Sequence, residues 1–388
     1  MLLSMNMKDT NSAHNLLIDF TYVKRSEDLS TSLAIYGCRL IQGFLRYGHY
    51  NIHVLLWRET EALLEKLVGV PFEKIILDKE DIPGRYLRSF IRLCGILPPG
   101  LKRELRRREI RKVLLPSHFC SIFHFLLPYS QYAVIHDLFY HERNREFRGK
   151  LSFLKWRSLD FMFLRTYRQL ITISNVVHDD VKRFTGRDSQ VLHNSLAFDF
   201  NTPEKTVEGI SGRPYILDVN SLHERKNPEV LIRALGLLKD SIPHILYLKV
   251  NRYCVDIRLR LEKLASNLGL EGRVIFDTDY RTESEIRYLY THADLFVSPS
   301  LMEGFGWTPI EAAILKTPVL VSDIEIFKEV TCGKIPTFDP RSPEDLATHI
   351  QEILMNPPTQ EKRKELADFF LETYSLKKQI ERLEEILA

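Results

Sequence analysis

The sequence has few cysteines, little net charge and no long apolar run. Its five cysteines are an odd number without a CxxC spacing, which fits neither a disulfide framework nor a zinc knuckle and favours a reducing setting. With 54 Lys and Arg against 51 Asp and Glu, the net charge of +3 excludes a polycation that coats nucleic acid. The N-terminus lacks the apolar core of a signal peptide, and the most apolar stretch, Val113 to Pro128, is interrupted by a proline and two histidines. We therefore expect a cytoplasmic protein that does not cross a membrane.

Short apolar runs of strand length alternate with helical patterns over most of the chain. The alternation starts at Leu16, lapses from Ser195 to Arg213 into Asn, Thr, Pro, Glu and Gly, and resumes at Tyr215. Strands separated by helices predict parallel sheets with crossover helices, and 388 residues suit two domains. The fold class is therefore α/β, with two Rossmann-like domains whose ligands lie at the carboxyl ends of the strands. We expect an N-terminal Rossmann-like domain at 1–195, a hinge at 196–213, a C-terminal Rossmann-like domain at 214–365, and an amphipathic helix over 366–388 that crosses the junction.

The most informative segment runs from Ser298 to Glu311, where an apolar strand turns on two glycines and enters a helix. Gly304 and Gly306 lack a Cβ, so backbone amides there can approach an anion closely, and the helix adds its positive end. This pattern predicts a pocket for a phosphate or a sugar. A purely structural interpretation stays open, because Thr308 and Glu311 have the spacing of a capping box, in which Glu311 only caps its own helix.

Arg225 and Lys226 follow the strand predicted at Tyr215 to Val219, and Asn227 and Pro228 then start a helix. A departing nucleoside diphosphate gains charge in the transition state, so two positioned cations stabilise that state more than the ground state. The alternative is a solvated pair of cations without a ligand.

The segment EGFGWTPIEA, which holds Glu303 and Glu311, resembles the ExxxxxxxE signature of the retaining GT-B glycosyltransferases of family GT4, the group 1 glycosyltransferases. The similarity is specific from about Tyr215 to Asp323. It implies a GT-B fold, in which two Rossmann-like domains face a central cleft. By resemblance, Glu303 contacts hydroxyls of the donor sugar and Glu311 holds the ribose hydroxyls. The backbone amides of the glycine turn would meet the distal phosphate and the sugar, at Gly304, Phe305, Gly306 and Trp307.

The remaining roles come from the same resemblance. The family has an Arg-Lys pattern in the loop of Arg225 and Lys226, so both are expected to bind the donor diphosphate. His136 and Asp137 end a predicted strand and resemble the family's acceptor-side pair. His136 would contact the donor sugar or phosphate and Asp137 would orient the acceptor hydroxyl, which makes these two and Glu303 the expected catalytic residues. The family is described as reacting on one face of the sugar, with the leaving phosphate assisting removal of the acceptor proton.

Three segments depart from the family or imitate another one. Ser26 to Ser32 stand in place of a glycine-rich loop, and Val250-Asn251-Arg252 stand where relatives often have Gly-x-Gly. Asp277 and Asp279 imitate the Asp-x-Asp that binds a divalent metal in the other major glycosyltransferase fold, because paired carboxylates suit hard cations. By position they match a base-binding turn of the GT-B pattern instead. We expect no metal and no other cofactor.

The segment from Arg85 to Lys112 is strongly basic, with ten Lys and Arg, two Glu and a net charge of +8. Apolar residues are interleaved, among them Leu97 and Leu101, so the segment is typical of a surface attracted to anionic lipid headgroups. A solvated helix face is the alternative, and no nucleic-acid recognition fold accompanies the charge. The membrane patch would centre on Arg103, Arg106, Arg107 and Arg108.

Taken together, these patterns predict a hexosyltransferase that moves a sugar from a nucleotide-diphosphate sugar to a hydroxyl of a glycan or lipid-linked acceptor. GDP-mannose is the preferred donor, although no residue selects the base, and surface polysaccharide assembly on the inner face of the cytoplasmic membrane is the expected setting. Two alternatives remain: a nucleotide-sugar 2-epimerase, and a non-catalytic nucleotide-sugar-binding protein.

Overall fold

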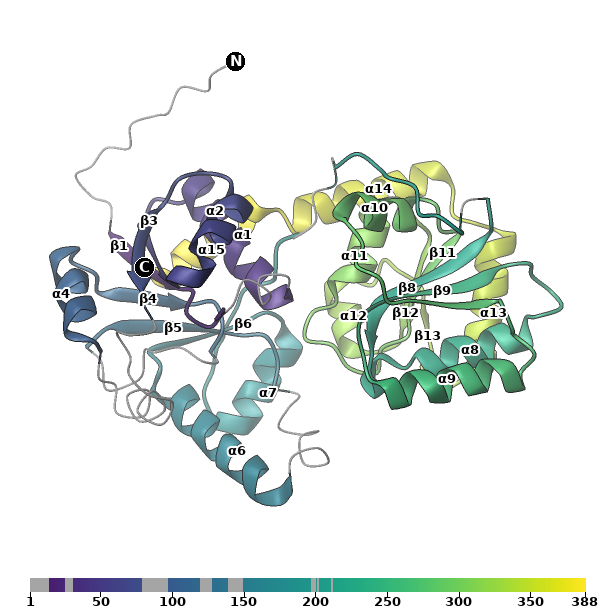
Figure 1. Ribbon diagram of the computed structural model, residues 1–388, viewed down its shortest axis with the longest axis horizontal. Helices are drawn as coiled ribbons and strands as arrows, with labels where there is room; N and C mark the ends of the chain where they lie inside the picture. The colour runs from purple at the N-terminus through teal and green to yellow at the C-terminus, as the bar shows by residue number, and fades with distance from the viewer. Residues whose placement is uncertain are drawn as a thin grey trace, which may run out of the picture. The chain divides into compact units, whose positions relative to one another are not determined.

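The computed structural model describes residues 14–24, 31–78, 97–118, 128–138, 149–196, 200, 202–210 and 212–388. The chain forms two compact units: Met1–Ala197 together with Leu376–Ala388, and Phe198–Ser375. Each unit holds a parallel sheet with helices packed on it, as the alternating sequence pattern predicts (Figure 1). Most of the loop at Ser26 to Ser32, residues 85–96, and the side chains of Asn251 and Arg252 lie outside the described part.

The sheet of the first unit has the order β3-β2-β1-β4-β5-β6-β7, and its neighbouring strands pair in parallel. Leu16, Leu17 and Ile18 of β1 are fully buried, because a central parallel strand is covered on both faces. The strands are β1 (Asn15–Asp19), β2 (Asn51–Trp57), β3 (Glu73–Leu77), β4 (Lys112–Leu115), β5 (Ser130–Ile135), β6 (Gln169–Thr172) and β7 (Gln190–Val191).

The helices of the first unit start and stop at residues suited to those positions. The Thr31 side chain accepts a hydrogen bond from Ala34 N at the start of α1, and Ser174 caps α7 in the same way. Gly186 ends α7 in the left-handed conformation that favours glycine. The bounds are α1 (Ser32–Tyr47), η2 (Arg58–Thr60), α2 (Glu61–Val68), α4 (Pro99–Arg107), α6 (Gly149–Thr166) and α7 (Asn175–Thr185).

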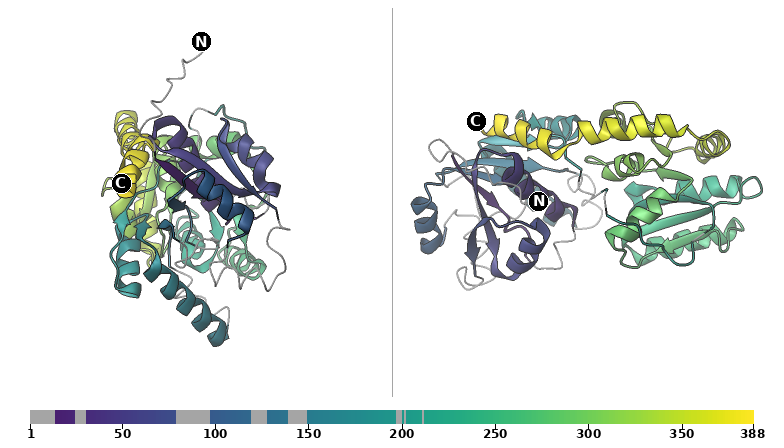
Figure 2. Two further views of the ribbon diagram at one scale, coloured as in Figure 1. Left: turned by 90° about the vertical axis from the view of Figure 1, so that its left-hand side faces the viewer. Right: turned by 90° about the horizontal axis from the view of Figure 1, so that it is seen from above.

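The C-terminal segment differs from the single helix predicted over 366–388. It consists of α14 (Gln360–Thr373) and α15 (Leu376–Leu387), because Tyr374 is anchored in the second unit by a hydrogen bond from its hydroxyl to Val330 O. The apolar face of α15, the yellow helix beside the C label in Figure 2, is buried in the first unit against α1. A Cβ on Gly43 of α1 would lie 2.6 Å from Ile380 Cγ1, so the two helices meet where only glycine fits.

The sheet of the second unit has the order β10-β9-β8-β11-β12-β13, also with parallel pairing. The chain starts at β8, moves outward to β10, and then returns to β11 on the other side of β8. The topological switch point therefore lies between β8 and β11, the position where such sheets bind ligands. The strands are β8 (Tyr215–Leu222), β9 (Ile245–Tyr253), β10 (Val274–Asp277), β11 (Leu295–Ser298), β12 (Val319–Ser322) and β13 (Thr337–Phe338).

Helices cover both faces of this sheet (Figure 1). On one face, α8, α9 and α13 contribute Leu231, Leu261 and Ile350 to a core shared with the strands. On the other face, α11 packs against α14. The bounds are η4 (Glu224–Lys226), α8 (Pro228–Leu237), α9 (Val255–Asn267), α10 (Glu283–Thr291), α11 (Trp307–Ile314), α12 (Glu325–Val330) and α13 (Pro343–Met355).

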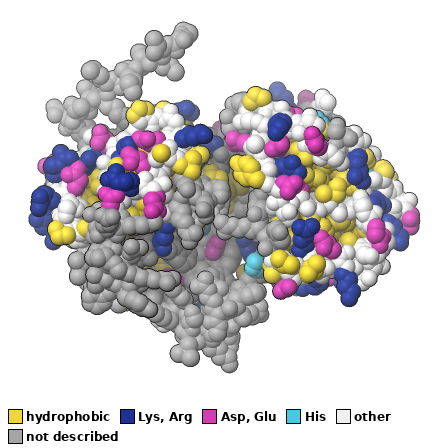
Figure 3. Space-filling view, in the orientation of Figure 1, with side chains coloured by type: hydrophobic (Ala, Val, Ile, Leu, Met, Phe, Trp, Pro, Cys, Tyr) yellow, Lys and Arg dark blue, Asp and Glu magenta, His cyan; other side chains and the backbone are white. Residues whose placement is uncertain are grey.

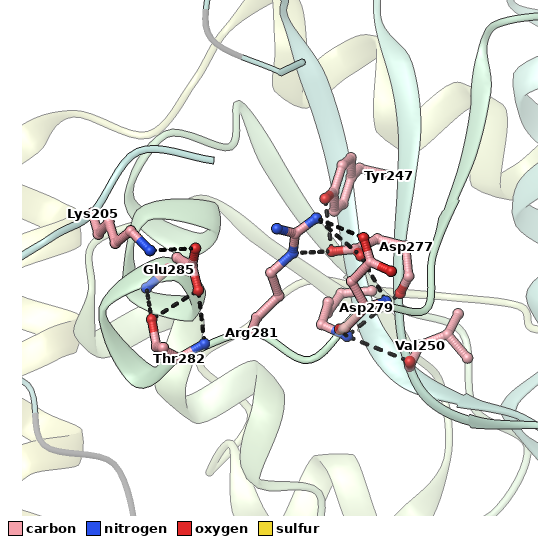
Figure 4. Close-up of polar contacts among 9 residues, drawn as sticks. Lys205, Tyr247, Val250, Asp277, Asp279, Arg281, Thr282 and Glu285 are labelled. Carbon is pink, nitrogen blue, oxygen red and sulfur yellow. Dashed lines mark hydrogen bonds and ion pairs between the residues drawn. The ribbon is translucent and has the colours of Figure 1, made fainter. Parts of the chain in front are cut away.

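The predicted hinge, 196–213, is longer than the connection that the structure shows. Arg287 of α10 donates to the carbonyl of Thr202 at 3.0 Å and to that of Phe200. Lys205 Nζ lies 3.1 Å from Glu285 Oε1, an ion pair visible in Figure 4. These contacts attach most of the expected hinge to the second unit, so the boundary between the units falls at Ala197 and Phe198.

Candidate active site

One buried cluster joins Glu303 to Arg225 and Lys226. These two cations precede Glu303 by 78 and 77 residues in the sequence. Lys226 Nζ donates to Glu303 Oε1, and Arg225 Nη1 donates to Oε2 at 3.2 Å. Ser300 Oγ adds a third hydrogen bond to the carboxylate at 2.7 Å. The loops after β8 and β11 meet because these strands are neighbours, and Leu301 N donates to Arg225 O at 2.7 Å. The cluster lies at the switch point, as the sequence motifs predict.

The electrostatics of this cluster keep Glu303 ionised. Burial alone would raise the pKa of Glu303, but Lys226 and Arg225 outweigh it and hold the pKa below its ordinary value. Two cations and one carboxylate leave a net positive charge of one. A charge of that sign at the switch point is suited to the phosphates of a nucleotide.

Asn227 shapes the loop that carries the two cations. Its backbone adopts φ 52°, a left-handed conformation that asparagine tolerates better than most residues. Its side-chain Nδ2 donates to Pro340 O at 2.8 Å, which ties the loop to the segment after β13. Pro228 then begins α8 at the first helical position.

The glycine turn is built for a close approach of backbone. Gly306 has φ 88°, and a Cβ there would lie 2.7 Å from Phe327 Cε1, so no other residue fits without strain. α11 starts directly after it at Trp307, where the first amides of a helix have no partner within the helix. The ring of Phe305 is buried and lies edge-on to Tyr374 with centroids 5.5 Å apart. The side chain of this predicted donor-binding residue is therefore part of the core.

Glu311 does not cap its own helix. The residue at the N-cap of α11 is Gly306, which has no side chain to share in a capping box, and Thr308 lies inside the helix. The Glu311 carboxylate instead accepts a hydrogen bond from the Tyr290 hydroxyl, which lies 3.0 Å from Oε2. Burial raises the pKa of Glu311 to about 7, and Tyr290 lowers it only in part. The capping interpretation is thus wrong. Glu311 lies beside the glycine turn, and the hydrogen bond from Tyr290 offsets only part of the cost of burying its charge.

Among the described residues, His136 and Asp137 lie at the carboxyl end of β5 in the first unit. His136 Nε2 lies 2.8 Å from Pro116 O and must carry the proton, because a carbonyl only accepts. The ring meets Tyr36 edge-on with centroids 4.7 Å apart. Burial lowers the pKa of His136 to about 4, so the imidazole is neutral at pH 7 and offers Nδ1 as an acceptor.

The Asp277 and Asp279 pair does not resemble a metal site. The Asp277 carboxylate accepts hydrogen bonds from Tyr247 Oη at 2.7 Å and from Arg281 Nε at 2.8 Å (Figure 4). A divalent cation would have to displace Arg281. No group of three or more His, Cys, Asp and Glu suited to a metal occurs within the described residues.

The sequence motifs do not mark three buried polar residues of the second unit. Lys249, in the middle of β9, donates to the carbonyl of Asp279 at 2.9 Å and fixes the turn after β10. Asp218 of β8 accepts from Asn220 Nδ2 at 2.6 Å, and burial raises its pKa to about 7. Tyr290 is the third. Each lies in a strand or helix among apolar residues that form the core. The only sequence signal is a polar group at a position where an apolar side chain is expected.

Within the described residues, the basic surface around α4 differs in composition from the one that the sequence predicts. Figure 3 shows Lys and Arg side chains gathered over α4, where Arg103, Arg106 and Arg107 are exposed. Arg108 is not part of it, because its guanidinium contacts Glu104, Glu73 and His53 between elements of the first unit. The predicted apolar component is absent from the described portion, since Leu97 and Leu101 are buried. Within the described residues, no helix is long and apolar enough to span a bilayer.

Solved structures establish the fold class. HepE of Anabaena, crystallised with UDP and glucose, superposes with a TM-score of 0.70 at 16% identity and covers 96% of this chain and 99% of its own. WaaG, a glycosyltransferase involved in lipopolysaccharide biosynthesis, has a TM-score of 0.62 at 17% identity and covers 96% of this chain and 99% of its own. The chain therefore has the GT-B fold.

The second unit is similar in sequence to known glycosyl transferases. Residues 201–368 match the family model of glycosyl transferases group 1. The O-antigen chain mannosyltransferase RfbU of Salmonella typhimurium is 29% identical over 59% of this chain and 62% of its own length. The serotype-specific mannosyltransferase WbdA of Escherichia coli is 27% identical over 59% of this chain, but that match spans only 29% of WbdA. The matched segment is nearly all of the second unit, and it contains the Arg225 and Lys226 loop and the segment from Glu303 to Glu311.

Proposed function

We propose that the protein is a retaining hexosyltransferase that moves a hexose from a nucleotide-diphosphate sugar to a hydroxyl of a glycan or lipid-linked acceptor. The observation that carries the proposal is the buried cluster of Glu303 with Lys226 and Arg225, which lies beside a glycine turn at the switch point of a group 1 domain. This arrangement combines a site for sugar hydroxyls with cations for a leaving diphosphate.

The cluster suits departure of a nucleoside diphosphate. As the glycosidic bond breaks, negative charge develops on the distal phosphate, and Arg225, Lys226 and the first amides of α11 stabilise that charge in the transition state. Glu303 accepts three hydrogen bonds, two of them from cations, which makes it a weak nucleophile. That weakness supports a reaction on one face of the sugar, in which the leaving phosphate helps to remove the acceptor proton.

His136 and Asp137 are proposed to act on the hydroxyls of the sugar and of the acceptor. A neutral His136 cannot attract a phosphate by charge, so of its two expected partners the sugar is the better supported. Its Nδ1 lone pair would accept a hydrogen bond from a hydroxyl, while Nε2 donates to Pro116 O. Asp137 is placed one residue further along, where it would orient the acceptor hydroxyl.

GDP-mannose is the proposed donor, and surface polysaccharide the proposed product. Support comes from two relatives that are named mannosyltransferases, one of them for an O-antigen chain. HepE, by contrast, was crystallised with UDP and glucose. Nucleotide release from a panel of guanosine, uridine and deoxythymidine diphosphate sugars, with a mixed membrane lipid extract as acceptor source, tests the donor. We expect release from GDP-mannose that Lys226→Ala and Glu303→Ala abolish.

The same assay separates the alternatives. A hexosyltransferase consumes donor only when acceptor is present, a 2-epimerase converts it without acceptor, and a binding protein leaves it intact. We also propose that neither a metal nor another cofactor takes part, since the Asp277 carboxylate is engaged by Arg281 and Tyr247. Full activity in excess chelator is the expected result, and loss of activity restored by Mg²⁺ or Mn²⁺ would contradict it.

We propose further that the α4 surface holds the protein on the cytoplasmic face of an anionic membrane. Arg103 and Arg106 form no ion pair with any described residue, and Lys102 lies beside them. With Leu97 and Leu101 buried, the attraction is electrostatic, so it should weaken as salt rises. Flotation with anionic and neutral vesicles at low and high salt tests this proposal. If the protein floats with neither vesicle type, the proposal is refuted.

A further inference from the structure

We propose that Tyr290 is a positioning residue of the donor site, where its hydroxyl holds the Glu311 carboxylate in the orientation that accepts hydrogen bonds from the ribose hydroxyls of the nucleotide sugar. The inference rests on the proposed function, which places the ribose at Glu311. It adds a residue that none of the sequence motifs contains.

Tyr290 is fixed in place by its surroundings. Its side chain is fully buried in the last turn of α10, and its ring packs against Phe296 of β11 with centroids 5.6 Å apart. Thr317, just before β12, donates from Oγ1 to the Tyr290 carbonyl at 2.6 Å. The Thr317 contact is to the main chain and does not reach the ring. The ring, packed against Phe296, presents its hydroxyl to Glu311 Oε2 at 3.0 Å.

The other carboxylate oxygen of Glu311 remains for a ligand. Within the described residues the Glu311 carboxylate forms no further hydrogen bond and no ion pair. A carboxylate has about four lone-pair sites, and Tyr290 occupies one of them, so Glu311 can still accept a hydrogen bond from each hydroxyl of a vicinal diol.

The hydrogen bond from Tyr290 also affects the charge of Glu311. Burial raises the pKa of the carboxyl, the hydrogen bond from Tyr290 lowers it, and the charge of Glu283 on α10 raises it further. The Tyr290 hydroxyl has a pKa far above neutrality, so it stays protonated and remains a donor. Removing it raises the pKa of Glu311, and a protonated carboxyl has fewer lone pairs for a diol.

The experiment compares Tyr290→Phe with Thr317→Val as a matched control. Each change removes one buried hydroxyl. The Tyr290 hydroxyl contacts Glu311, whereas the Thr317 hydroxyl contacts only the main-chain carbonyl of Tyr290. Calorimetric titration at pH 6, 7 and 8.5 would measure the binding of guanosine and uridine diphosphate and of their 2′,3′-dideoxy analogues. Donor KM and kcat would be measured with the same variants, and Glu311→Ala serves as the reference for complete loss of ribose recognition.

We expect the wild type to prefer the ribonucleotide over its dideoxy analogue and Tyr290→Phe to reduce that preference by about tenfold, the effect of one hydrogen bond to a charged group. Donor KM should rise by a similar factor while kcat stays nearly constant. The loss should be larger at pH 6 than at pH 8.5. Thr317→Val should keep the preference at every pH.

The experiment distinguishes failure of the donor-site assignment from failure of the role proposed for Tyr290. If Glu311→Ala keeps the ribose preference, or the wild type has none, the donor-site assignment is wrong and both proposals fall. If Glu311→Ala loses the preference and Tyr290→Phe keeps it, only the role of Tyr290 is overturned. Should Tyr290→Phe not fold, Glu311→Asp replaces it, because it keeps the charge but withdraws the carboxylate from the hydroxyl; an unchanged preference in that variant would contradict the proposal.

Discussion

Substituting Lys226 separates the structural role of the buried cluster from its catalytic role. Lys226→Met keeps most of the apolar stem but removes the cation from Glu303, whose side chain is 10% exposed. Breaking a buried ion pair on one side costs about 3–5 kcal/mol. Because Arg225 at 3.2 Å and Ser300 at 2.7 Å still contact the carboxylate, we expect the lower end, about 3 kcal/mol.

For a unit of this size, about 1 kcal/mol shifts the melting temperature by about 2–4 °C, so Lys226→Met should melt about 6–12 °C lower. Adding Glu303→Gln removes the uncompensated charge and should restore at least half of that loss. Activity should behave differently: loss of one donor to the developing charge lowers kcat by about 10²–10³ fold, and the second change cannot restore it. Thermal melting and nucleotide release, measured on both variants, check the two effects.

Two results would refute this reasoning. An unchanged melting temperature in Lys226→Met would mean that the Lys226 and Glu303 contact contributes nothing to stability. Recovery of turnover in the double variant would mean that Lys226 acts only by neutralising Glu303 and has no role in stabilising a leaving phosphate.

Three further predictions concern other parts of the structure. Gly306→Ala should lower both melting temperature and donor affinity, because its φ of 88° and the 2.7 Å approach to Phe327 leave no space for a methyl group; wild-type affinity in calorimetry would contradict this. The pKa of Glu311 in the folded protein is raised to about 7, so stability rises as pH falls from about 7 towards 4.5, and Glu311→Gln should stabilise at pH 8 but not at pH 4.5 in thermal melts. Arg103→Glu with Arg106→Glu should abolish flotation with anionic vesicles while leaving nucleotide release from soluble acceptors intact; retained flotation would exclude α4.

Periodicity was sufficient to predict most of the fold. The central strands, such as β1, β5, β11 and β12, are apolar runs buried on both faces, and the strand positions agree with the sequence pattern to within a few residues. The sequence pattern predicts one helix over 366–388, so neither the start of α14 nor the break between α14 and α15 was predicted. That break depends on tertiary contacts, since Tyr374 is anchored to Val330 and Ile380 packs on Gly43, and neither contact leaves a local signal.

Some residues of the candidate site could be predicted from sequence motifs and others could not. Glu303, Lys226 and the glycine turn carry motifs with a stated physical purpose, and the structure brings them together. Tyr290 could not be predicted, because a tyrosine in the apolar pattern of α10 is more often core, and its role depends on the neighbouring α11. Arg108 shows the opposite error: a basic run predicts a charged surface, but the fold uses this arginine to join α4 to β2 and β3.

The most direct test of the central claim is the fate of GDP-mannose incubated with the protein, with and without membrane lipid extract, beside Lys226→Ala and Glu303→Ala. We predict release of GDP only when the extract is present, transfer of mannose to the lipid fraction with retention at the anomeric carbon, and loss of both in the two variants. Conversion of the donor without extract, or no conversion of any nucleotide sugar despite tight binding, would contradict the assignment as a hexosyltransferase.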